Sequence, residues 1–599
     1  MSRQSYQFQK LLSRRAMIFG GIQLAAGSAL LSRLYYLQFV RGEEFKTEAE
    51  GNRIKVQLLI PPRGLITDRN GDLLAGNDIN FRLILDRENP TQAVATLLRV
   101  GEILGWSHAQ IKALRAQIPR RPAPPMLLAQ QLEWEAMAKI EFHLPELPGV
   151  LIEEGQWRNY PYADHAAHLL GYVGKVSEAE VAKDPHPLLK LPDMKIGKNG
   201  VEYLFEQELR GTAGTRQMEV NVYGMPVREL AKKEPTPGKK LALTIDARLQ
   251  EFIVQRLGEE SGAVVVMHVH TGEILALVSV PGFDPNEFSK GISQRYWNEL
   301  MANEKNPLLN KAIAGQYPPG STFKMLVGLA GLKAGVINAS TRIHCPGHFY
   351  LGNHRFNCWK PEGHGSMNFT DAIAQSCDTY FYTVAHKAGI EAFSSMAHEF
   401  GIGELTELGL KGEKPGIMPD PAWKRRTRNL PWNPGETINA SIGQGDVLAT
   451  PLQLALMTAR MVNGGKKIQP RLTPYTEGTN YAFIDIDAKY LELALEGMDM
   501  VTNHPRGTAY GSHIAEEAYQ FGGKTGTSQV RRITVRGQDQ SRLPWKMRHH
   551  ALFVGYAPRQ KPEYCISVMI EHGGGGSSAA APVARDVMRK LLELMEGNP

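Results

Sequence analysis

The sequence predicts a mixed α+β (α/β) fold, with one transmembrane helix near the N-terminus followed by a smaller and a larger α+β domain. Three observations support this prediction. A long uncharged apolar run stands near the start of the 599-residue chain. After it, strand-like and helix-like segments alternate, and the composition changes at a linker-like stretch, 235–240. A chain of this length also exceeds one ordinary domain.

Composition narrows the class of protein. Hydrophobic residues make up 42% and charged residues 22%, which is typical of globular chains. The net charge of +7 is a mild excess that suits an anionic polymer or simply a solvated surface. Because Lys and Arg form no dense block, nucleic acid is not an expected partner. Four cysteines are too few for a disulfide scaffold.

The first 40 residues predict a single-pass membrane anchor. Residues 16–31 carry no charge, and apolar and aromatic character resumes after Arg33. A stretch of ~20 apolar residues spans a bilayer, and 16–40 reaches this length if Arg33 extends its charge to the interface. The basic residues that precede the span place 1–15 in the cytoplasm. The alternative is a cleaved signal peptide, with a small-residue site around 25–29.

The region 41–238 is predicted to be an α+β domain on a stalk. Its segments are a charged stalk at 41–53, a strand at 54–60, the turn-rich stretch 61–72, amphipathic helices over 90–140 interrupted at 119–125, and a helix at 201–210. In that last helix, Glu202 in the first turn and Arg210 in the last complement the helix dipole.

The region 239–599 is predicted to be the second domain. Its segments include a strand at 241–245, a helix from Asp246 to about 258, hairpin strands at 263–267 and 273–279, and a final helix at about 582–595. The low-complexity segment GGGGSSAAA, 573–581, is predicted to be a flexible surface loop rather than a phosphate-binding loop.

The first motif with chemical potential is PPGSTFK, 318–324, which runs into an apolar helical stretch. Ser321 and Lys324 are three residues apart, so both face one side of the first helical turn. Backbone N–H groups at that helix start can stabilise an oxyanion, and a neutral Lys324 can take the proton of the Ser321 hydroxyl. A Ser-x-x-Lys pair alone is weak evidence, because about two are expected by chance in a chain of this size.

The second motif is Ser376-Cys377-Asp378. Ser376 can relay a proton between Lys324 and a leaving amine, and Asp378 is a further polar member. The alternative is that Asp378 merely caps a helix.

The third motif is FGGKTGTS, 521–528, which reads as a strand. Gly526 lets a substrate backbone approach closely. Lys524 is expected to supply positive charge for a substrate carboxylate, while Thr525 and Thr527 offer hydroxyl groups. The N–H group of Thr527 completes the predicted oxyanion hole. Read alone, this segment is a Lys-bearing turn or edge strand.

Together and in this order, the three motifs resemble the S-x-x-K, S-D-N and K-T-G set of β-lactamases and penicillin-binding proteins. The second motif departs from the family pattern, because this chain has Asp378 where the third position of the S-D-N motif has Asn. The chain most resembles class B penicillin-binding proteins, in particular the elongation-type transpeptidases, whose members often carry Ser-x-Asp. Further similar stretches are PPRGLITDRNG (61–71), GKNGVEYLFEQELRGTAG (197–214), IGQGDVLATPLQLA (442–455) and HALFVGYAP (550–558).

The resemblance implies a fold and a reaction. It implies a non-catalytic pedestal of the dimerisation type at 41–238, and a transpeptidase domain at 239–599 with helices around a five-stranded antiparallel sheet. Ser321 would attack the penultimate D-Ala carbonyl of a peptidoglycan stem peptide, and a neighbouring amine would resolve the acyl-enzyme, with a D,D-carboxypeptidase side activity. β-Lactams would acylate the same serine.

The resemblance also implies a location and partners. The chain would be anchored by one helix in the bacterial inner membrane, with its catalytic domain in the periplasm. No glycosyltransferase module is expected. The pedestal would bind a membrane glycan polymerase of the SEDS family and other proteins of the elongation complex, and the activity would maintain cell shape.

Cys345, Cys358, His364 and Cys377 lie within 33 residues, in the pattern Cys-x12-Cys-x5-His-x12-Cys. Three thiolates and an imidazole are the ligands of a closed structural zinc site. A disulfide, or simple burial of small thiols, remains an alternative. Some relatives of the resembled group have a zinc site of carboxylates, His and Cys at similar places. His364 and Cys377 match those positions, whereas Cys345 and Cys358 stand where Asp is expected.

Other functions fit the sequence less well. A division-type transpeptidase is disfavoured by Asp378 and by the cysteines. A free β-lactamase or carboxypeptidase needs neither an anchor nor a pedestal. A penicillin sensor should have several membrane spans and a cytoplasmic output domain. A catalytically silent scaffold should have lost Ser321 or Lys524, and both are present.

Overall fold

The computed structural model describes residues 3–40, 54–191, 193–220, 226–531 and 539–597. The stalk expected at 41–53 lies outside these residues. Contacts between residues divide the chain into two compact units. Unit 1 comprises Met1–Pro61, Ile79–Gln156 and Thr212–Thr236, and unit 2 comprises Pro62–Asp78, Trp157–Gly211 and Pro237–Pro599.

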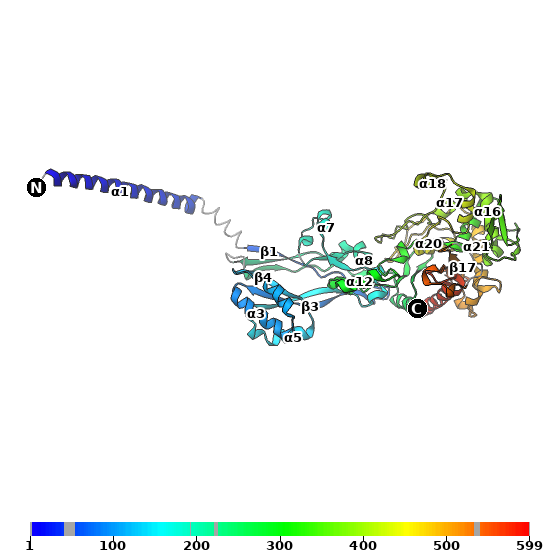
Figure 1. Cartoon of the computed structure of the whole chain (residues 1–599), viewed down its shortest axis with the longest axis horizontal. Coiled ribbons are helices and arrows are strands. Elements are labelled where there is room, and N and C mark those ends of the chain that lie inside the picture. Colours follow the sequence, from blue (N-terminus) through cyan, green and yellow to red (C-terminus); the bar gives the residue numbers. More distant parts are fainter. Residues whose placement is uncertain (1–2, 41–53, 192, 221–225, 532–538, 598–599) are drawn as a thin grey trace. The chain divides into compact units, whose positions relative to one another are not determined.

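The N-terminal helix has the length and composition of a membrane span. Helix α1 (Arg3–Tyr35) continues into a short π-helical turn, η1 (Tyr36–Val40) (Figure 1). Within it, the 25 residues Ala16–Val40 form the one candidate span among the described residues, and none of this window is buried inside the protein. Its length and apolar composition suit a hydrocarbon environment.

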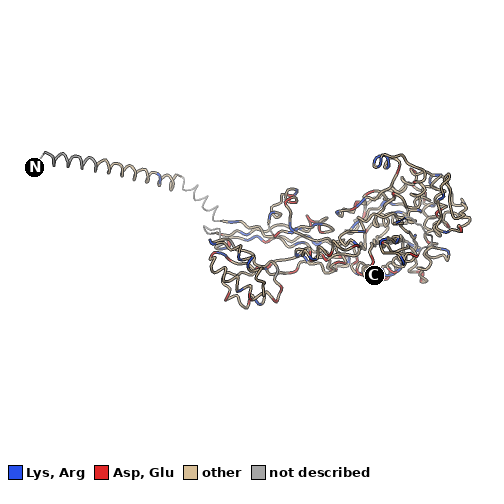
Figure 2. Tube along the Cα trace, in the orientation of Figure 1, with Lys and Arg blue, Asp and Glu red and all other residues tan. Residues whose placement is uncertain are grey.

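Unit 1 contains a three-stranded sheet and a small helical core. Strand β8 (Gly214–Val220) pairs antiparallel with both β1 (Ile54–Leu59) and β9 (Pro226–Lys233). Helices α3 (Pro90–Ile103) and α5 (Trp134–Phe142) share their core with strand β4 (Ala123–Leu132). Figure 2 shows basic and acidic residues interspersed along the trace.

The prediction of helices over 90–140 is therefore wrong at β4. This segment begins with Ala-Pro-Pro, and proline cannot donate the backbone hydrogen bonds that a helix interior needs. Met126 and Leu128 instead alternate with exposed Leu127 and pack into the core, as a half-buried strand requires.

Unit 2 contains a buried ion cluster where one ten-residue helix was expected. The segment forms two short helices, α8 (Gly200–Leu204) and α9 (Glu206–Arg210). The carboxylate of Glu202 is fully buried and receives Arg63 Nε at 2.6 Å and Arg158 Nε at 2.6 Å. Burial raises the pKa of Glu202, but the two guanidinium groups outweigh it and hold this pKa below its usual value.

The five-stranded antiparallel sheet that the resemblance implied is present in unit 2. Its strand order is β12-β11-β19-β18-β17. The strands are β11 (Gly262–His268), β12 (Ile274–Val280), β17 (Gly522–Ser528), β18 (His550–Ala557) and β19 (Tyr564–Ile570). Every neighbouring pair in this order is antiparallel.

Helices cover both faces of this sheet. On β11, Val264 and Val266 belong to the core that contains residues of α10 (Ala247–Leu257) and α22 (Ala581–Glu596). The alternate residues Val265 and Met267 belong to the core that contains residues of α20 (Pro451–Val462). Because side chains alternate across a strand, the two sets face opposite sides of the sheet. The sheet is thus covered on both faces, which explains its nearly continuous burial.

The low-complexity segment 573–581 is not the flexible surface loop that its composition predicts. Residues Gly576–Ala580 form a π-helical turn that leads into α22. A Cβ atom on Gly576 would lie 2.3 Å from the carbonyl oxygen of Gly526. Glycine at position 576 is therefore required by the close approach of this turn to β17.

We predict that Glu202→Gln destabilises the protein by about 3 kcal/mol, because buried Arg158 loses its counter-charge and Arg63 keeps only its ion pair with Glu206. Urea unfolding of the full-length chain in detergent measures this loss. Glu208→Gln is the matched control, since Glu208 is an exposed carboxylate in α9. Equal stability of the two variants would contradict a structural role for the ion cluster.

Candidate active site

Ser321 lies in a tight turn at the start of a buried helix. The 3-10 turn η5 (Gly320–Phe323) runs directly into α14 (Lys324–Lys333). Gly320 has φ +58°, and a Cβ atom there would lie 2.6 Å from the carbonyl oxygen of Thr527. Glycine at this position therefore brings the turn against β17. Ser321 is partly exposed, whereas Lys324 is fully buried.

The amine of Lys324 connects the first two motifs. Its Nζ donates to the backbone oxygen of Ser376 at 2.8 Å, to Ser376 Oγ at 3.1 Å and to Asp378 Oδ1 at 2.7 Å. Asp378 begins helix α16 (Asp378–Ala388). Burial raises the pKa of Asp378, and the charge of Lys324 offsets only part of that effect. Asp378 is thus a partner of the buried lysine, in addition to its place at a helix start.

The third motif contributes a second buried lysine. In β17, Lys524 is fully buried, and its Nζ donates to Ser376 Oγ at 3.0 Å and to the backbone oxygen of Thr525 at 2.9 Å. Burial lowers the pKa of Lys524 well below its usual value, and the nearby charge of Lys324 lowers it further. Ser376 Oγ therefore lies between two lysine amines.

The expected site residues thus fall into two groups. Lys324, Ser376, Asp378 and Lys524 are joined in one hydrogen-bond network. The turn that bears Ser321 packs against the backbone of β17 at Thr527, and Thr525 Oγ1 shares a hydrogen bond of 2.8 Å with Thr508 Oγ1.

Three further residues contact this site and were not predicted. Gln444 donates its side-chain amide to the backbone oxygen of Thr527 at 3.0 Å, Thr508 contacts Thr525, and Trp359 contacts the second motif. Gln444 lies in the stretch 442–455 that had been noted only as a resemblance. Thr508 belongs to no recognisable sequence pattern. The sequence analysis assigned a role to Cys358 but none to Trp359, which follows it.

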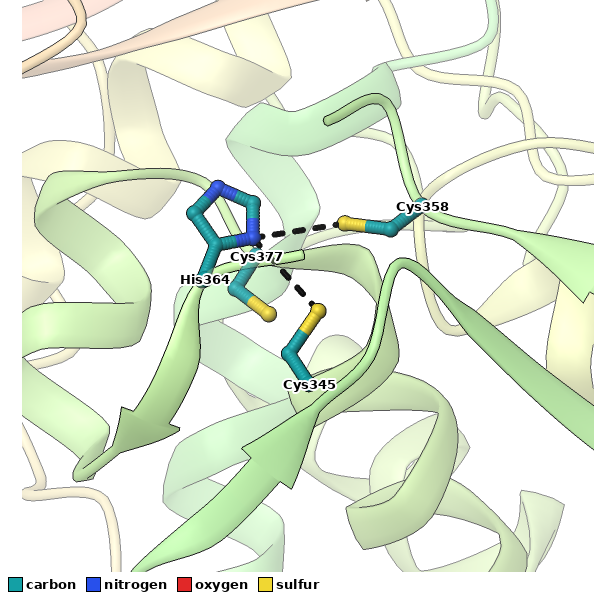
Figure 3. Close-up of side chains that lie close together, drawn as sticks. All are labelled: Cys345, Cys358, His364 and Cys377. Carbon is teal, nitrogen blue, oxygen red and sulfur yellow. Dashed lines mark hydrogen bonds between the residues drawn. The ribbon is translucent and has the colours of Figure 1, made fainter. Parts of the chain in front are cut away.

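The four predicted metal ligands come together beside the second motif (Figure 3). The three sulfur atoms and one imidazole nitrogen all lie within 4.8 Å of one another. His364 Nδ1 is 3.5 Å from the sulfur of Cys345 and 3.5 Å from that of Cys358. The cysteines are buried and form no disulfide in the structure.

The thiols also alter the acid–base behaviour of the histidine. Burial lowers the pKa of His364, but Cys345 and Cys358 more than offset it, and the pKa is raised to about 9. Cys377, the fourth member, stands in the chain between Ser376 and Asp378. The cluster is therefore adjacent in the chain to the hydrogen-bond network of Lys324, Ser376 and Lys524.

A separate cavity of about 480 Å³ lies at the C-terminal end of β19. Its lining includes Asn306, Trp545, Glu571 and His572, and it includes none of the three motifs. Glu571 accepts a hydrogen bond of 2.8 Å from the hydroxyl of Tyr317.

Comparisons with known proteins identify the class. Residues 262–589 match the model of the penicillin-binding protein transpeptidase domain, and residues 59–243 match the penicillin-binding protein dimerisation domain. The chain belongs to the family of penicillin-binding proteins with a transpeptidase domain.

Within that family the chain is similar to the elongation-type group. It is 37% identical to the peptidoglycan D,D-transpeptidase MrdA of Acinetobacter baumannii, over 99% of this chain and 90% of that protein. Its fold resembles PBP2 of Helicobacter pylori in complex with MreC, with a TM-score of 0.81 and 32% identity over 90% of this chain and 99% of that one.

A third likeness is to a chain from a peptidoglycan synthase complex that coordinates polymerization and crosslinking. The TM-score is 0.69 at 30% identity, and the match covers 96% of this chain and 97% of that chain.

We predict that Lys524→Met changes how stability depends on pH. The pKa of Lys524 is lower in the folded state than in the unfolded state. At a pH between these two pKa values, unfolding therefore takes up a proton, and the free energy of unfolding rises with pH. The unfolding free energy of wild type minus that of Lys524→Met should therefore increase from pH 7 to pH 9.5. Urea unfolding with exposed Lys489→Met as the control measures it, and a constant or decreasing difference would contradict the lowered pKa.

Proposed function

We propose that this chain is a peptidoglycan D,D-transpeptidase of cell elongation that works through an acyl-enzyme on Ser321. The observation that carries the proposal is the buried network of Lys324, Ser376 and Lys524, built from all three motifs next to the turn that bears Ser321. The similarity to MrdA over nearly the whole chain supports the substrate and the cellular process.

In the proposed first step, Ser321 Oγ attacks the carbonyl carbon of the penultimate D-Ala of a stem peptide. Lys324, acting in its neutral form, accepts the hydroxyl proton, and the backbone N–H groups of Ser321 and Thr527 stabilise the oxyanion. The peptide C–N bond then breaks. The leaving D-Ala amine takes its proton through Ser376 Oγ, which both buried lysines contact.

In the second step, an amine of a neighbouring stem peptide attacks the ester carbon and gives up a proton through the same network. The C–O bond to Ser321 breaks, and the serine regains its proton. Attack by water instead would give a D,D-carboxypeptidase side activity, and β-lactams would acylate the same oxygen.

The buried position of Lys524 refines the role expected for it. Its amine faces Ser376, so we assign the direct contacts with the substrate carboxylate to the hydroxyl groups of Thr525 and Thr527, with Gly526 between them. Lys524 contributes by long-range charge and by sharing protons with Ser376. An arriving carboxylate would raise the pKa of Lys524, because a nearby negative charge favours the ammonium form.

We propose that residues 16–40 anchor the chain in the bacterial inner membrane, with 1–15 cytoplasmic and the remainder periplasmic. We assign 41–238 to a non-catalytic pedestal and 239–599 to the transpeptidase domain. The likenesses to a PBP2–MreC complex and to a peptidoglycan synthase complex support elongation-complex partners. We propose that a SEDS-family polymerase, which the family resemblance implies, is one of them.

We propose that the four-residue cluster holds a structural zinc ion. Tetrahedral zinc with Zn–S of ~2.3 Å and Zn–N of ~2.0 Å sets an S···N separation of about 3.5 Å. The two distances from His364 Nδ1 to Cys345 and Cys358 agree with that separation. Cys377 supplies the fourth ligand. Bound zinc would fix the cysteine-bearing loop and take no part in bond making.

We predict that Ser321→Ala abolishes covalent labelling of the full-length chain by a fluorescent penicillin, since no other residue would carry the acyl group. Gel fluorescence measures the labelling, and Ser528→Ala, at the end of β17, should still be labelled. Persistent labelling of Ser321→Ala would refute the proposed nucleophile.

We predict about one zinc per chain in protein purified without chelators, as measured by inductively coupled plasma mass spectrometry. Cys358→Ser should lower this content several-fold, because the site loses a thiolate ligand. Cys565→Ser is the matched control, since Cys565 is a buried cysteine of β19 outside the cluster. Metal-free protein with a disulfide between two cluster cysteines would refute the zinc site.

A further inference from the structure

Trp359 is a large aromatic residue in an unusual place. It follows Cys358 directly, after strand β15 (His354–Asn357), and 56% of it is exposed. Its ring centroid lies 5.3 Å from that of His364. A tryptophan this exposed contributes little core packing, so its position calls for another explanation.

Two hydrogen bonds explain the position of Trp359. The backbone N–H of Trp359 donates to Asp378 Oδ2 at 2.8 Å. The indole Nε1–H donates to the backbone oxygen of Ser376 at 3.0 Å, and it lies 3.2 Å from that of Gln375. One residue therefore contacts both polar members of the second motif.

Ser376 needs such support because its backbone is strained. Its φ of +56° lies in the left-handed region, which is unfavourable for a residue other than glycine. This conformation persists only if the surroundings hold it. The backbone oxygen of Ser376 is held by two donors, Lys324 Nζ at 2.8 Å and the Trp359 indole.

We propose that Trp359 is a positioning residue for the transpeptidase reaction, whose indole N–H holds the Ser376 backbone so that Ser376 Oγ stays between Lys324 and Lys524. This inference rests on the proposed function. Trp359 acts through Ser376 and Asp378 and touches no reacting atom.

The same geometry couples the cysteine cluster to catalysis. Trp359 follows Cys358, and Cys377 stands between Ser376 and Asp378. Each side of the hydrogen-bonded contact is thus adjacent in the chain to a thiol of one cluster.

Trp359→Phe tests the proposal, because it keeps an aromatic ring and the backbone N–H but removes the indole donor. In full-length chain, the first-order acylation constant k2 for a fluorescent penicillin should fall about tenfold, the effect of one lost hydrogen bond. The dissociation constant Ks of the pre-acylation complex and the zinc content should stay within twofold. Trp297→Phe, on helix α12 (Gln294–Ala302), is the matched control and should leave k2 unchanged.

A double-mutant cycle with Ser376→Ala separates positioning from a merely structural role. If Trp359 acts by orienting the Ser376 hydroxyl, Trp359→Phe should slow acylation tenfold in wild type but less than twofold in the Ser376→Ala background. Equal losses in both backgrounds, or an unchanged k2 with lowered thermal stability, would overturn the proposal. Either result leaves the role of Ser321 intact, whereas loss of the proposed function itself would appear as labelling that survives Ser321→Ala.

Discussion

The site depends on providing hydrogen-bond acceptors for the amine of Lys324, which is buried away from water. Lys324 is fully buried, and a buried ammonium that lacks partners is very costly. Its three acceptors all belong to Ser376 and Asp378. This constraint explains why Ser376 adopts a left-handed backbone, because that conformation turns both its backbone oxygen and its hydroxyl toward the same amine.

The second lysine follows from the first. Lys524 shares the Ser376 hydroxyl, and its pKa is lowered by burial and then by the charge of Lys324. The charge of Lys324 disfavours a second ammonium group beside the same oxygen, and the pKa of Lys524 is lowered although the carboxylate of Asp378 opposes this effect. Such a site is suited to accept a proton from a nucleophile and return it to a leaving group, which is the chemistry that transpeptidation requires.

The sequence predicted the parts of the site that are encoded locally. Spacing placed Ser321 and Lys324 on one helical turn, and the order of the three motifs pointed to the family and hence to the five-stranded sheet. Outside these motifs and the cysteine cluster, local patterns did not predict contacts between distant segments. Composition suggested that 573–581 is flexible, but Gly576 is needed for the close approach to β17. Glu202 suited a helix dipole, yet it serves a buried ion cluster whose arginines lie far away in the sequence.

The same limit applies to orientation within the site. From the sequence, Lys524 on its strand was expected to bind a substrate carboxylate. Only the folded structure shows that its amine faces Ser376. The most direct test of the proposed mechanism is a structure of the chain acylated by a β-lactam. The mechanism requires an ester on Ser321 Oγ, with its carbonyl oxygen within hydrogen-bond distance of the N–H groups of Ser321 and Thr527, and the ligand carboxylate on Thr525 and Thr527. An adduct on another residue, or a carbonyl oxygen directed away from β17, would contradict it.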